Sequence, residues 1–189
     1  MQETAKRMQA IIEDLLTYSH AKTTDHKFEK TDLTIIVNDV LKDFELLIQE
    51  KKATIVSDRL CKTSIIPSQF RQLIYNLISN SFKFSNPEKR IHITIKSKIE
   101  TGSKLNNKKL LPDIDYCHMI YTDNGIGFDA QYKNRIFEVF QRLHSKEAYK
   151  GTGMGLAICK RVVENHKGII TATGQLNKGA RFDIYIPTN

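Results

Sequence analysis

The sequence contains no apolar run long enough to cross a membrane. Its longest apolar stretches, such as the one around Ile65 and Ile66, are only a few residues long, whereas a transmembrane helix needs about 20 mostly apolar residues. The N-terminal stretch MQETAKRMQA lacks the apolar centre of a signal peptide. We therefore expect a cytoplasmic chain, which is either soluble in its own right or the cytosolic portion of a membrane protein.

Cysteine is also scarce. The three cysteines, Cys61, Cys117 and Cys159, are far apart and form no CxxC pair. An odd number at such spacing argues against a disulfide framework, and the absence of CxxC argues against a zinc site. We expect three reduced thiols inside the core.

The composition indicates a soluble globular chain. It is 40% hydrophobic and 26% charged, and 189 residues suffice for one domain with a short appendage. The net charge of +8 is compatible with nucleic acid, an anionic membrane or phosphorylated ligands. The densest basic stretch, Lys104–Lys109, has neither an RNA-binding aromatic motif nor zinc-finger spacing around it. We interpret it as a solvated loop and expect no nucleic-acid partner.

Hydrophobic periodicity predicts a mixture of helices and strands. Helices are expected at about 1–20, 33–50, 68–85 and 155–166, with Asp32 as the cap of the second. Strands are expected at about 53–57, 61–66, 90–99, 116–122, 168–173 and 180–186. Because these elements do not alternate as regular βαβ units, an α+β two-layer sandwich is favoured.

The N-terminal part is predicted to be an appendage of this domain. Residues 1–20 form a helix with a narrow apolar stripe, which must be covered by the domain itself or by another chain in a coiled-coil-like bundle. Residues 21–30 are polar and aperiodic, so they are interpreted as a linker, and residues 31–189 as the domain. The stripe consists of Met8, Ile11, Ile12, Leu15, Leu16 and Ser19.

The helix at 68–85 carries the first candidate site residues. Asn76, Asn80 and Lys83 follow one another at i, i+4 and i+7, beside the apolar face of the helix. Two amides and an ammonium group suit a hard cation such as Mg²⁺ with phosphates next to it, because amide oxygens are neutral ligands that this ion accepts. The alternative is a polar helix edge that faces solvent.

Two glycine-containing motifs are further candidates: one follows a predicted strand, and the other precedes a predicted helix. Asp123–Phe128 (DNGIGF) places a carboxylate at a strand end, where it can accept a hydrogen bond from an amino group such as that of adenine; the alternative is a turn. Gly151–Leu156 (GTGMGL) precedes a helix whose free N–H groups can bind phosphate; the alternative is a hinge. The second motif is neither the dinucleotide fingerprint nor a P-loop.

In this order the Asn/Asn/Lys helix, DNGIGF, IFEVFQRL and GTGMGLA resemble the N box, first glycine box, phenylalanine box and second glycine box of sensor histidine kinases in two-component systems. The resemblance covers about residues 30–187. The stretch IFEVFQRLHSKEAYKGTG is similar to phytochrome-like and other hybrid kinases. The family implies the Bergerat-type fold of the GHKL superfamily, in which helices cover one face of a mixed sheet.

The resemblance also implies a role for each motif residue in binding ATP and Mg²⁺. Asn80 would bind Mg²⁺, Asp123 would hold the adenine amino group, and Arg142 would reach the γ-phosphate. Residues 129–150 would form a lid, anchored by Phe137 and Phe140. The implied catalytic residues are Asn76, Lys83 and Arg142. The remaining implied ATP contacts are Phe84, Gly125, Gly127, Phe128, Gly151, Thr152, Gly153, Met154, Gly155 and Leu156.

The residue type at position 76 bears on the reaction. Hydrolases with this fold carry a glutamate there, which activates water, whereas Asn76 cannot accept a proton at neutral pH. We therefore expect phosphotransfer by a protein-histidine kinase. The alternatives are a degenerate nucleotide-binding module without kinase activity and an ATP hydrolase.

The phosphoacceptor histidine of the family is not recognisable in this chain. No histidine is directly followed by an acidic residue, so we expect that this chain alone does not phosphorylate itself and that it begins within the second helix of the dimerisation hairpin. His20 is interpreted as a surface residue, His92 and His118 as structural, His144 as solvent-facing, and His166 as a helix end where a cation is favourable. The implied partners are the histidine-bearing dimerisation helix, a response-regulator receiver domain and a second copy in the full-length homodimer.

Overall fold

The computed structural model describes residues 8–9, 11–13, 15–16, 18–19, 27–143 and 151–188. Residues 8–9, 11–13, 15–16 and 18–19 are helical, as expected for the N-terminal segment. The α-helices that follow are α2 (Leu33–Asp43), α3 (Glu45–Lys51), α4 (Pro67–Lys83) and α5 (Gly155–Asn165). The strands are β1 (Glu29–Asp32), β2 (Thr54–Ser57), β3 (Lys62–Ile65), β4 (His92–Thr101), β5 (Asp115–Asp123), β6 (Ile169–Gln175) and β7 (Gly179–Pro187). Among these described residues, no helix is both long and apolar enough to span a membrane.

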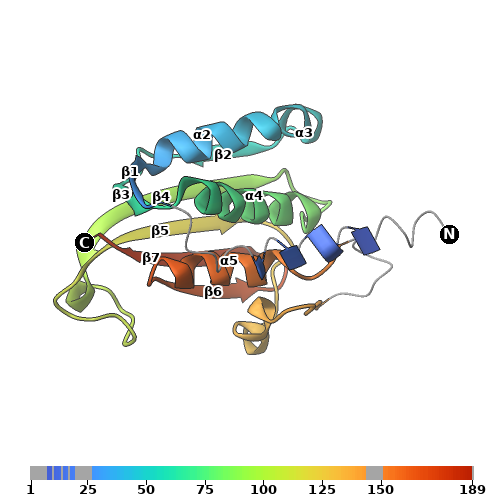
Figure 1. Cartoon of the computed structure of the whole chain (residues 1–189). Coiled ribbons are helices and arrows are strands. Elements are labelled where there is room, and N and C mark those ends of the chain that lie inside the picture. The colour runs from blue at the N-terminus through green and yellow to red at the C-terminus, as the bar shows by residue number, and fades with distance from the viewer. Residues whose placement is uncertain are drawn as a thin grey trace.

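The main sheet has five strands in the order β2-β4-β5-β7-β6. Strand β2 pairs with β4 in parallel, and the other neighbours pair antiparallel. Figure 1 shows α2, α4 and α5 lying side by side over one face of this mixed sheet. The expected α+β two-layer sandwich, with helices on one face, is therefore confirmed.

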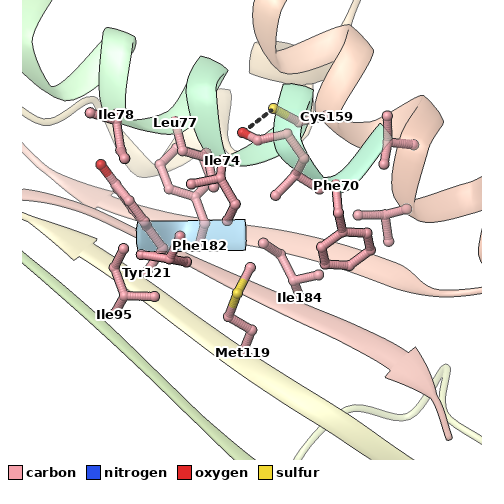
Figure 2. Close-up of a cluster of buried hydrophobic side chains, with 14 of the residues drawn as sticks. Phe70, Ile74, Leu77, Ile78, Ile95, Met119, Tyr121, Cys159, Phe182 and Ile184 are labelled. Atoms are coloured by element: carbon pink, nitrogen blue, oxygen red, sulfur yellow. Dashed lines mark hydrogen bonds between the residues drawn. The ribbon is translucent and has the colours of Figure 1, made fainter. Parts of the chain in front are cut away.

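The core lies between α4 and the sheet. Figure 2 shows side chains of α4 packed against those of β4, β5 and β7. The helix repeats its apolar residues every three or four positions, so they all face the strands. The labelled residues are Phe70, Ile74, Leu77 and Ile78 of α4, Cys159 of α5, and Ile95, Met119, Tyr121, Phe182 and Ile184 on the sheet side.

For the helix expected at 33–50, the predicted cap is confirmed but the predicted length is wrong. Asp32 caps α2 as predicted, because its side chain accepts a hydrogen bond from the Thr34 N–H at 3.0 Å. The expected single helix at 33–50 instead breaks at Phe44, which ends α2 and precedes α3. The Phe44 ring is buried and stacks on Phe82 at 5.8 Å, so packing on α4 overrides the continuous helical pattern.

The start of the domain contains a strand that the sequence pattern did not reveal. Glu29 and Lys30, assigned to the linker, belong to β1, which pairs antiparallel with β3. Of the apolar stripe before it, Met8, Ile12, Leu15 and Leu16 are about half exposed or more. His20 and residues 21–26 lie outside the described part of the chain.

The expectation of three reduced thiols is wrong for two of them. Cys61 and Cys117 form a disulfide, with Cα atoms 6.3 Å apart and a sequence separation of 56. Cys117 lies in β5 of the main sheet, and Cys61 immediately precedes β3 of the two-stranded sheet. The tertiary fold therefore brings together two residues whose sequence spacing gave no signal. Cys159 is the buried free thiol that was expected. Its sulfur lies 3.7 Å from the Leu73 carbonyl oxygen (Figure 2), and burial raises its pKa to about 12.

The basic Lys104–Lys109 segment belongs to the long β4–β5 connection. Its lysines are exposed, as expected for a solvated loop. Leu105 and Leu110, however, are buried against Tyr116 and Tyr185 in a small second cluster. The connection is therefore anchored on the sheet through its leucines.

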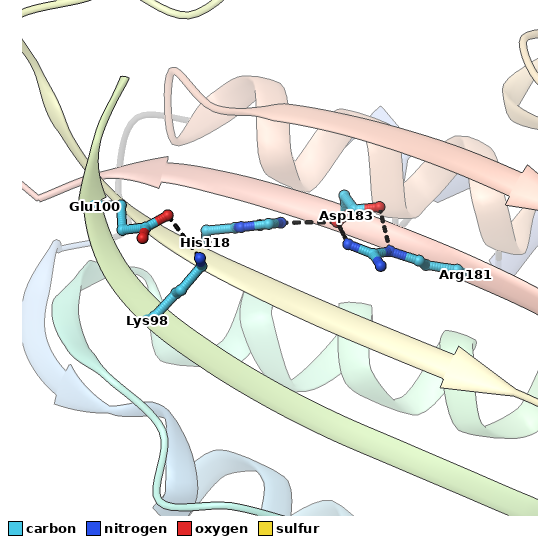
Figure 3. Close-up of polar contacts among 5 residues, drawn as sticks. All are labelled: Lys98, Glu100, His118, Arg181 and Asp183. Atoms are coloured by element: carbon cyan, nitrogen blue, oxygen red, sulfur yellow. Dashed lines mark hydrogen bonds and ion pairs between the residues drawn. The ribbon is translucent and has the colours of Figure 1, made fainter. Parts of the chain in front are cut away.

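His118 occupies the sheet face opposite the helices. Figure 3 shows it between the strands with Asp183 and Arg181. Its Nε2 lies 2.8 Å from Asp183 Oδ1, and the Arg181 guanidinium donates to both oxygens of the same carboxylate. Burial alone would raise the pKa of Asp183, but hydrogen bonds from His118 and Arg181 lower it overall. The structural interpretation of His118 fits this network.

His166 joins the two central helices. Its Nε2 accepts the Ile66 N–H at 2.9 Å at the start of α4, and its Nδ1 donates to the Val162 carbonyl at 2.7 Å in α5. Because Nε2 must accept, the ring in this arrangement is neutral, and burial lowers its pKa below the ordinary 6.5. The expectation of a favourable cation at this helix end is therefore wrong: His166 is buried, with 5% of its surface exposed.

We predict that His166→Gln lowers the free energy of unfolding by about 1–3 kcal/mol at pH 8, because buried hydrogen-bonding groups lose their partner. The folded-state pKa of His166 is depressed, so its contribution is complete above pH 6.5 and is lost as pH falls through the folded-state pKa. The difference in free energy of unfolding between the wild type and the variant should therefore shrink as pH falls below 6.5. The decrease should be at most about 1.4 kcal/mol per pH unit. Urea unfolding across this range measures it. His92→Gln, at an exposed position on β4, is the control, and a difference that does not vary with pH contradicts the neutral ring.

Candidate functional site

The predicted motifs meet around one cavity of about 310 Å³. Its walls come from α4, the end of β5, the segment after β5, the glycine-rich turn before α5, and β7. Residues far apart in sequence thus surround one space. The lining residues are Asn76, Ser79, Asn80, Lys83, Phe84, Asp123, Gly127, Phe128, Ile136, Gln141, Arg142, Leu143, Gly151, Thr152, Gly153, Gly155, Leu156, Ala180 and Phe182.

The polar edge of α4 lines the cavity, as the functional interpretation of this helix requires. Asn76, Asn80 and Lys83 are all half-buried. The Asn76 amide nitrogen donates to the Gly155 carbonyl at 3.2 Å, and its oxygen accepts from Gln72 at 3.1 Å. Asn76 therefore ties α4 to the first residue of α5, which places the glycine-rich helix start against the amide edge.

Asp123 is the last residue of β5 and the one carboxylate among the residues that line the cavity. Its Oδ1 accepts the Gly125 N–H at 2.9 Å and the Ala180 N–H at 3.3 Å, and its Oδ2 accepts the Ser81 hydroxyl at 3.0 Å. Burial raises the pKa of Asp123, and these hydrogen bonds oppose the shift. The carboxylate is thus held by three donors while it borders the cavity.

The DNGIGF motif is a turn and a cavity wall at the same time. Asn124 accepts the His92 N–H with its side-chain oxygen and donates to the Arg90 carbonyl, both at 2.8 Å, so the turn is fastened to the start of β4. A Cβ on Gly125 would lie 2.5 Å from the Phe84 carbonyl oxygen. Gly127 has φ +64, and its Cβ would meet the Gln175 carbonyl oxygen at 2.1 Å. Only glycine fits at either position.

Two cations border the same cavity. Burial lowers the pKa of Lys83, and the nearby Arg142 charge lowers it further. The Lys83 ammonium lies 4.7 Å from the centre of the Phe84 ring, and a Cβ on Gly151 would come within 2.3 Å of it. Like charges gathered on one partly buried wall favour an anionic ligand, because such a ligand relieves their repulsion.

The start of α5 adds a third positive element. Gly155 and Leu156, its first two residues, line the cavity, and the N–H groups of a first helical turn have no partner within the helix. The helix dipole places partial positive charge at this end. Met154, the residue before the helix, is fully buried in the core, and its N–H donates to the Thr152 hydroxyl at 3.2 Å. The start of α5 is therefore held in place by the buried Met154 side chain and by this hydrogen bond.

The described part of the expected lid, residues 129–143, contains two short 3₁₀ turns (Ala130–Tyr132 and Arg135–Phe137). Phe137 is buried, and its ring packs on Phe182 with centroids 6.5 Å apart. Phe140 is 53% exposed and has a positive φ of 62°. Residues 144–150, including His144, lie outside the described residues.

Most of the expected site residues line the cavity, and four do not. Gly125, Phe137, Phe140 and Met154 are not among its lining residues; Gly125, Phe137 and Met154 instead support the wall through the contacts described above. Sequence reasoning missed Ser79, Ile136, Gln141, Leu143, Ala180 and Phe182. Ala180 and Phe182 alternate along β7 on the helix-facing side, so the period-2 pattern of that strand was the available signal.

Comparison with known proteins agrees with this geometry. Residues 65–189 match the family described as "Histidine kinase-, DNA gyrase B-, and HSP90-like ATPase". The chain is 38% identical over 186 residues to cyanobacterial phytochrome A from a Nostoc species, which covers 98% of this chain and 22% of the phytochrome. This chain thus spans about a fifth of the length of that relative.

Two solved structures share the fold over nearly the whole chain. The structure of full-length ShkA in complex with AMPPNP superposes with a TM-score of 0.75 at 20% identity, covering 98% of this chain and 36% of ShkA. The histidine kinase ThkA, in complex with the response regulator protein TrrA, gives a TM-score of 0.72 at 18% identity, covering 100% of this chain and 49% of that chain. The family match extends over the glycine-rich turns, α4 and α5, and we conclude that this chain belongs to the histidine kinase-, DNA gyrase B- and HSP90-like ATPase family.

Proposed function

We propose that the chain is the catalytic domain of a sensor histidine kinase, which binds Mg-ATP in the cavity and delivers the γ-phosphate to a histidine on a dimerisation helix. The observation that carries the proposal is the chemistry of the cavity wall. One carboxylate with an oriented acceptor oxygen and two cations beside a helix N-terminus border the same space. ATP offers the complementary groups, an amino group on its base and a chain of phosphates.

Asp123 is the residue that would recognise the base. Its oxygens are acceptors, and three of their lone-pair positions are taken by Ser81, Gly125 and Ala180. A ligand atom that approaches the remaining position must be a donor, and the 6-amino group of adenine is one. Phe128 and Phe182 supply apolar wall to the cavity, as a flat aromatic base requires.

The phosphates would lie against Lys83, Arg142 and the start of α5. Asn80 would hold Mg²⁺ through its amide oxygen, since this ion accepts one or two protein ligands and completes its shell with water and phosphate oxygens. When bound, Mg²⁺ would neutralise charge on the phosphates.

Kinase chemistry is favoured over hydrolysis by Asn76. Its nitrogen donates to Gly155 and its oxygen accepts from Gln72, and an amide cannot take a proton from water. A degenerate binding module is disfavoured, because Asn80, Lys83 and Asp123 are all present at the cavity. By analogy with the ThkA–TrrA complex, we propose a response-regulator receiver domain as a partner. We also propose that the exposed side chains of Met8, Ile12, Leu15 and Leu16 form part of a dimerisation surface.

Asp123→Asn should weaken ATP binding about 100-fold while the fold persists. The amide has one acceptor oxygen in place of two, and if that oxygen keeps the Gly125 and Ala180 N–H groups, its NH₂ group faces the amino group of the base. Two donors then meet, which costs about 1–3 kcal/mol of binding. Calorimetry with Mg-ATP measures the affinity, and thermal unfolding verifies the fold. Asp113→Asn, at an exposed position in the β4–β5 connection, is the matched control. An unchanged affinity in the Asp123 variant excludes this residue from base recognition.

Asn80→Ala should remove the magnesium-dependent part of the binding. Wild-type affinity for ATP is expected to fall when EDTA replaces Mg²⁺, whereas the variant should bind with the same, weaker affinity in both buffers because it lacks the amide oxygen. Asn106→Ala, at an exposed position in the same connection as Asp113, should behave as the wild type. A variant that retains the full magnesium effect rules out Asn80 as the ligand.

The phosphotransfer itself is tested by mixing this chain with a separately expressed, histidine-bearing dimerisation hairpin and radiolabelled ATP. Label should appear on the hairpin, remain absent from this chain alone, and disappear with Asp123→Asn. Steady phosphate release without a labelled hairpin would instead favour a hydrolase. A label on this chain that depends on one of its own histidines would overturn the expectation that the acceptor lies elsewhere.

A further inference from the structure

Two buried hydroxyl groups lie directly behind the carboxylate that faces the cavity. Ser81 of α4 is 3% exposed, and Tyr121 of β5 is fully buried. Neither lines the cavity. The Ser81 oxygen lies 2.8 Å from the Tyr121 hydroxyl oxygen and 3.0 Å from Asp123 Oδ2. Figure 2 shows the Tyr121 side chain rising from the sheet with its hydroxyl directed toward α4.

We propose that Ser81 and Tyr121 are positioning residues that orient Asp123, and thereby set the preference of the site for a base with an exocyclic amino group. This inference rests on the proposed function, since it assumes that Asp123 receives the base. It assigns a role in nucleotide selection to two residues that need not touch the nucleotide.

The direction of the hydrogen bonds follows from counting protons. The Tyr121 hydroxyl is buried, and burial raises its pKa well above the ordinary value, so it keeps its proton. A buried hydroxyl hydrogen is donated to a partner, and Ser81 lies at hydrogen-bond distance. Tyr121 therefore donates to the Ser81 oxygen, which leaves the single Ser81 hydrogen for another acceptor.

Two acceptors compete for that Ser81 hydrogen. The Leu77 carbonyl oxygen is 3.2 Å away, and Asp123 Oδ2 is 3.0 Å away. A charged acceptor makes the stronger hydrogen bond, so the Ser81 hydrogen points to Asp123. The resulting chain runs from Tyr121 through Ser81 to Asp123, and each bond polarises the next.

This series of hydrogen bonds determines how many acceptor positions Asp123 offers to a ligand. A carboxylate has about four lone-pair positions. Oδ1 accepts from Gly125 and Ala180, and Oδ2 accepts from Ser81. About one position therefore remains, on Oδ2, for a group in the cavity. Without Ser81, Oδ2 would have two positions open, and a water molecule could compete with the amino group of the base.

The charges around Asp123 do not supply the same orientation. Lys83 and Arg142 also border the cavity, on α4 and on the segment after β5. The hydrogen bonds that hold the Asp123 carboxylate come from Gly125, Ser81 and Ala180. On the core side, the titratable groups that interact electrostatically with Tyr121 are Asp123 and Cys159. Orientation of Oδ2 therefore depends on a neutral hydroxyl.

The test compares two nucleotides in each variant by calorimetry, in the presence of Mg²⁺. One is ATP, and the other is purine riboside triphosphate, which lacks only the 6-amino group. In the wild type, removal of the amino group should weaken binding at least tenfold. In Ser81→Ala, ATP should bind about tenfold more weakly while the analogue changes less than about twofold, so that the benefit of the amino group nearly disappears.

Tyr121→Phe keeps the ring and removes the first donor, so it should act in the same direction with a smaller effect, about threefold on ATP alone. It also provides a second, nearly isosteric variant if Ser81→Ala fails to fold, as thermal unfolding would reveal. Ser68→Ala and Tyr75→Phe are matched controls on exposed positions of α4. Both should leave the affinities for the two nucleotides unchanged.

The outcomes separate this inference from the proposed function. Equal weakening of both nucleotides in the two variants would mean a merely structural role and would overturn the inference, as would unchanged affinity for ATP. In either case binding of ATP to the wild type would leave the proposed function standing. Failure of the wild type to bind ATP at all would overturn both.

Discussion

The packing of α4 on the central strands is the constraint on which the rest of the molecule depends. One face of this helix buries Phe70, Leu73, Ile74 and Leu77 against the sheet, and this burial fixes its rotation about its own axis. The neighbouring edge, with Asn76, Asn80 and Lys83, then has no freedom to face elsewhere than the cavity. Hydrophobic burial, which has no directional preference of its own, thereby orients the polar groups of the site.

The second central helix is placed by contacts at both of its ends. Asn76 binds the carbonyl of Gly155 at its start, and His166 accepts the Ile66 N–H just after its end. Both contacts join α5 to α4, so the helix whose N-terminus borders the cavity is aligned with the helix that carries the amide edge. A shift of either helix would have to break a hydrogen bond at one of the two ends, and the partners at the His166 end are buried.

The features predicted from sequence are those with a local or periodic signal. The apolar arc of α4, the Asp32 cap and the glycine-rich start of α5 each need only a few neighbouring residues to be recognised. The resemblance of the ordered motifs to those of sensor histidine kinases then implied that they share one ATP site. Long-range pairs left no such signal: the disulfide between Cys61 and Cys117, the pairing of β1 with β3, and the stacking of Phe44 on Phe82 that interrupts the first helix. The hydrogen bond from Ser81 to Asp123 joins residues 42 apart, and it depends on strand register that periodicity alone does not set.

The DNGIGF turn is held in place by hydrogen bonds within the folded chain itself. Asn124 is hydrogen-bonded to the His92 N–H and the Arg90 carbonyl at the start of β4, and Asp123 is held by the backbone N–H groups of Gly125 and Ala180. The groups proposed to meet the base are therefore already held by hydrogen bonds in the folded chain, so little conformational entropy would be lost there when a ligand binds. A nucleotide that binds first through its base would therefore contact groups that are already in position.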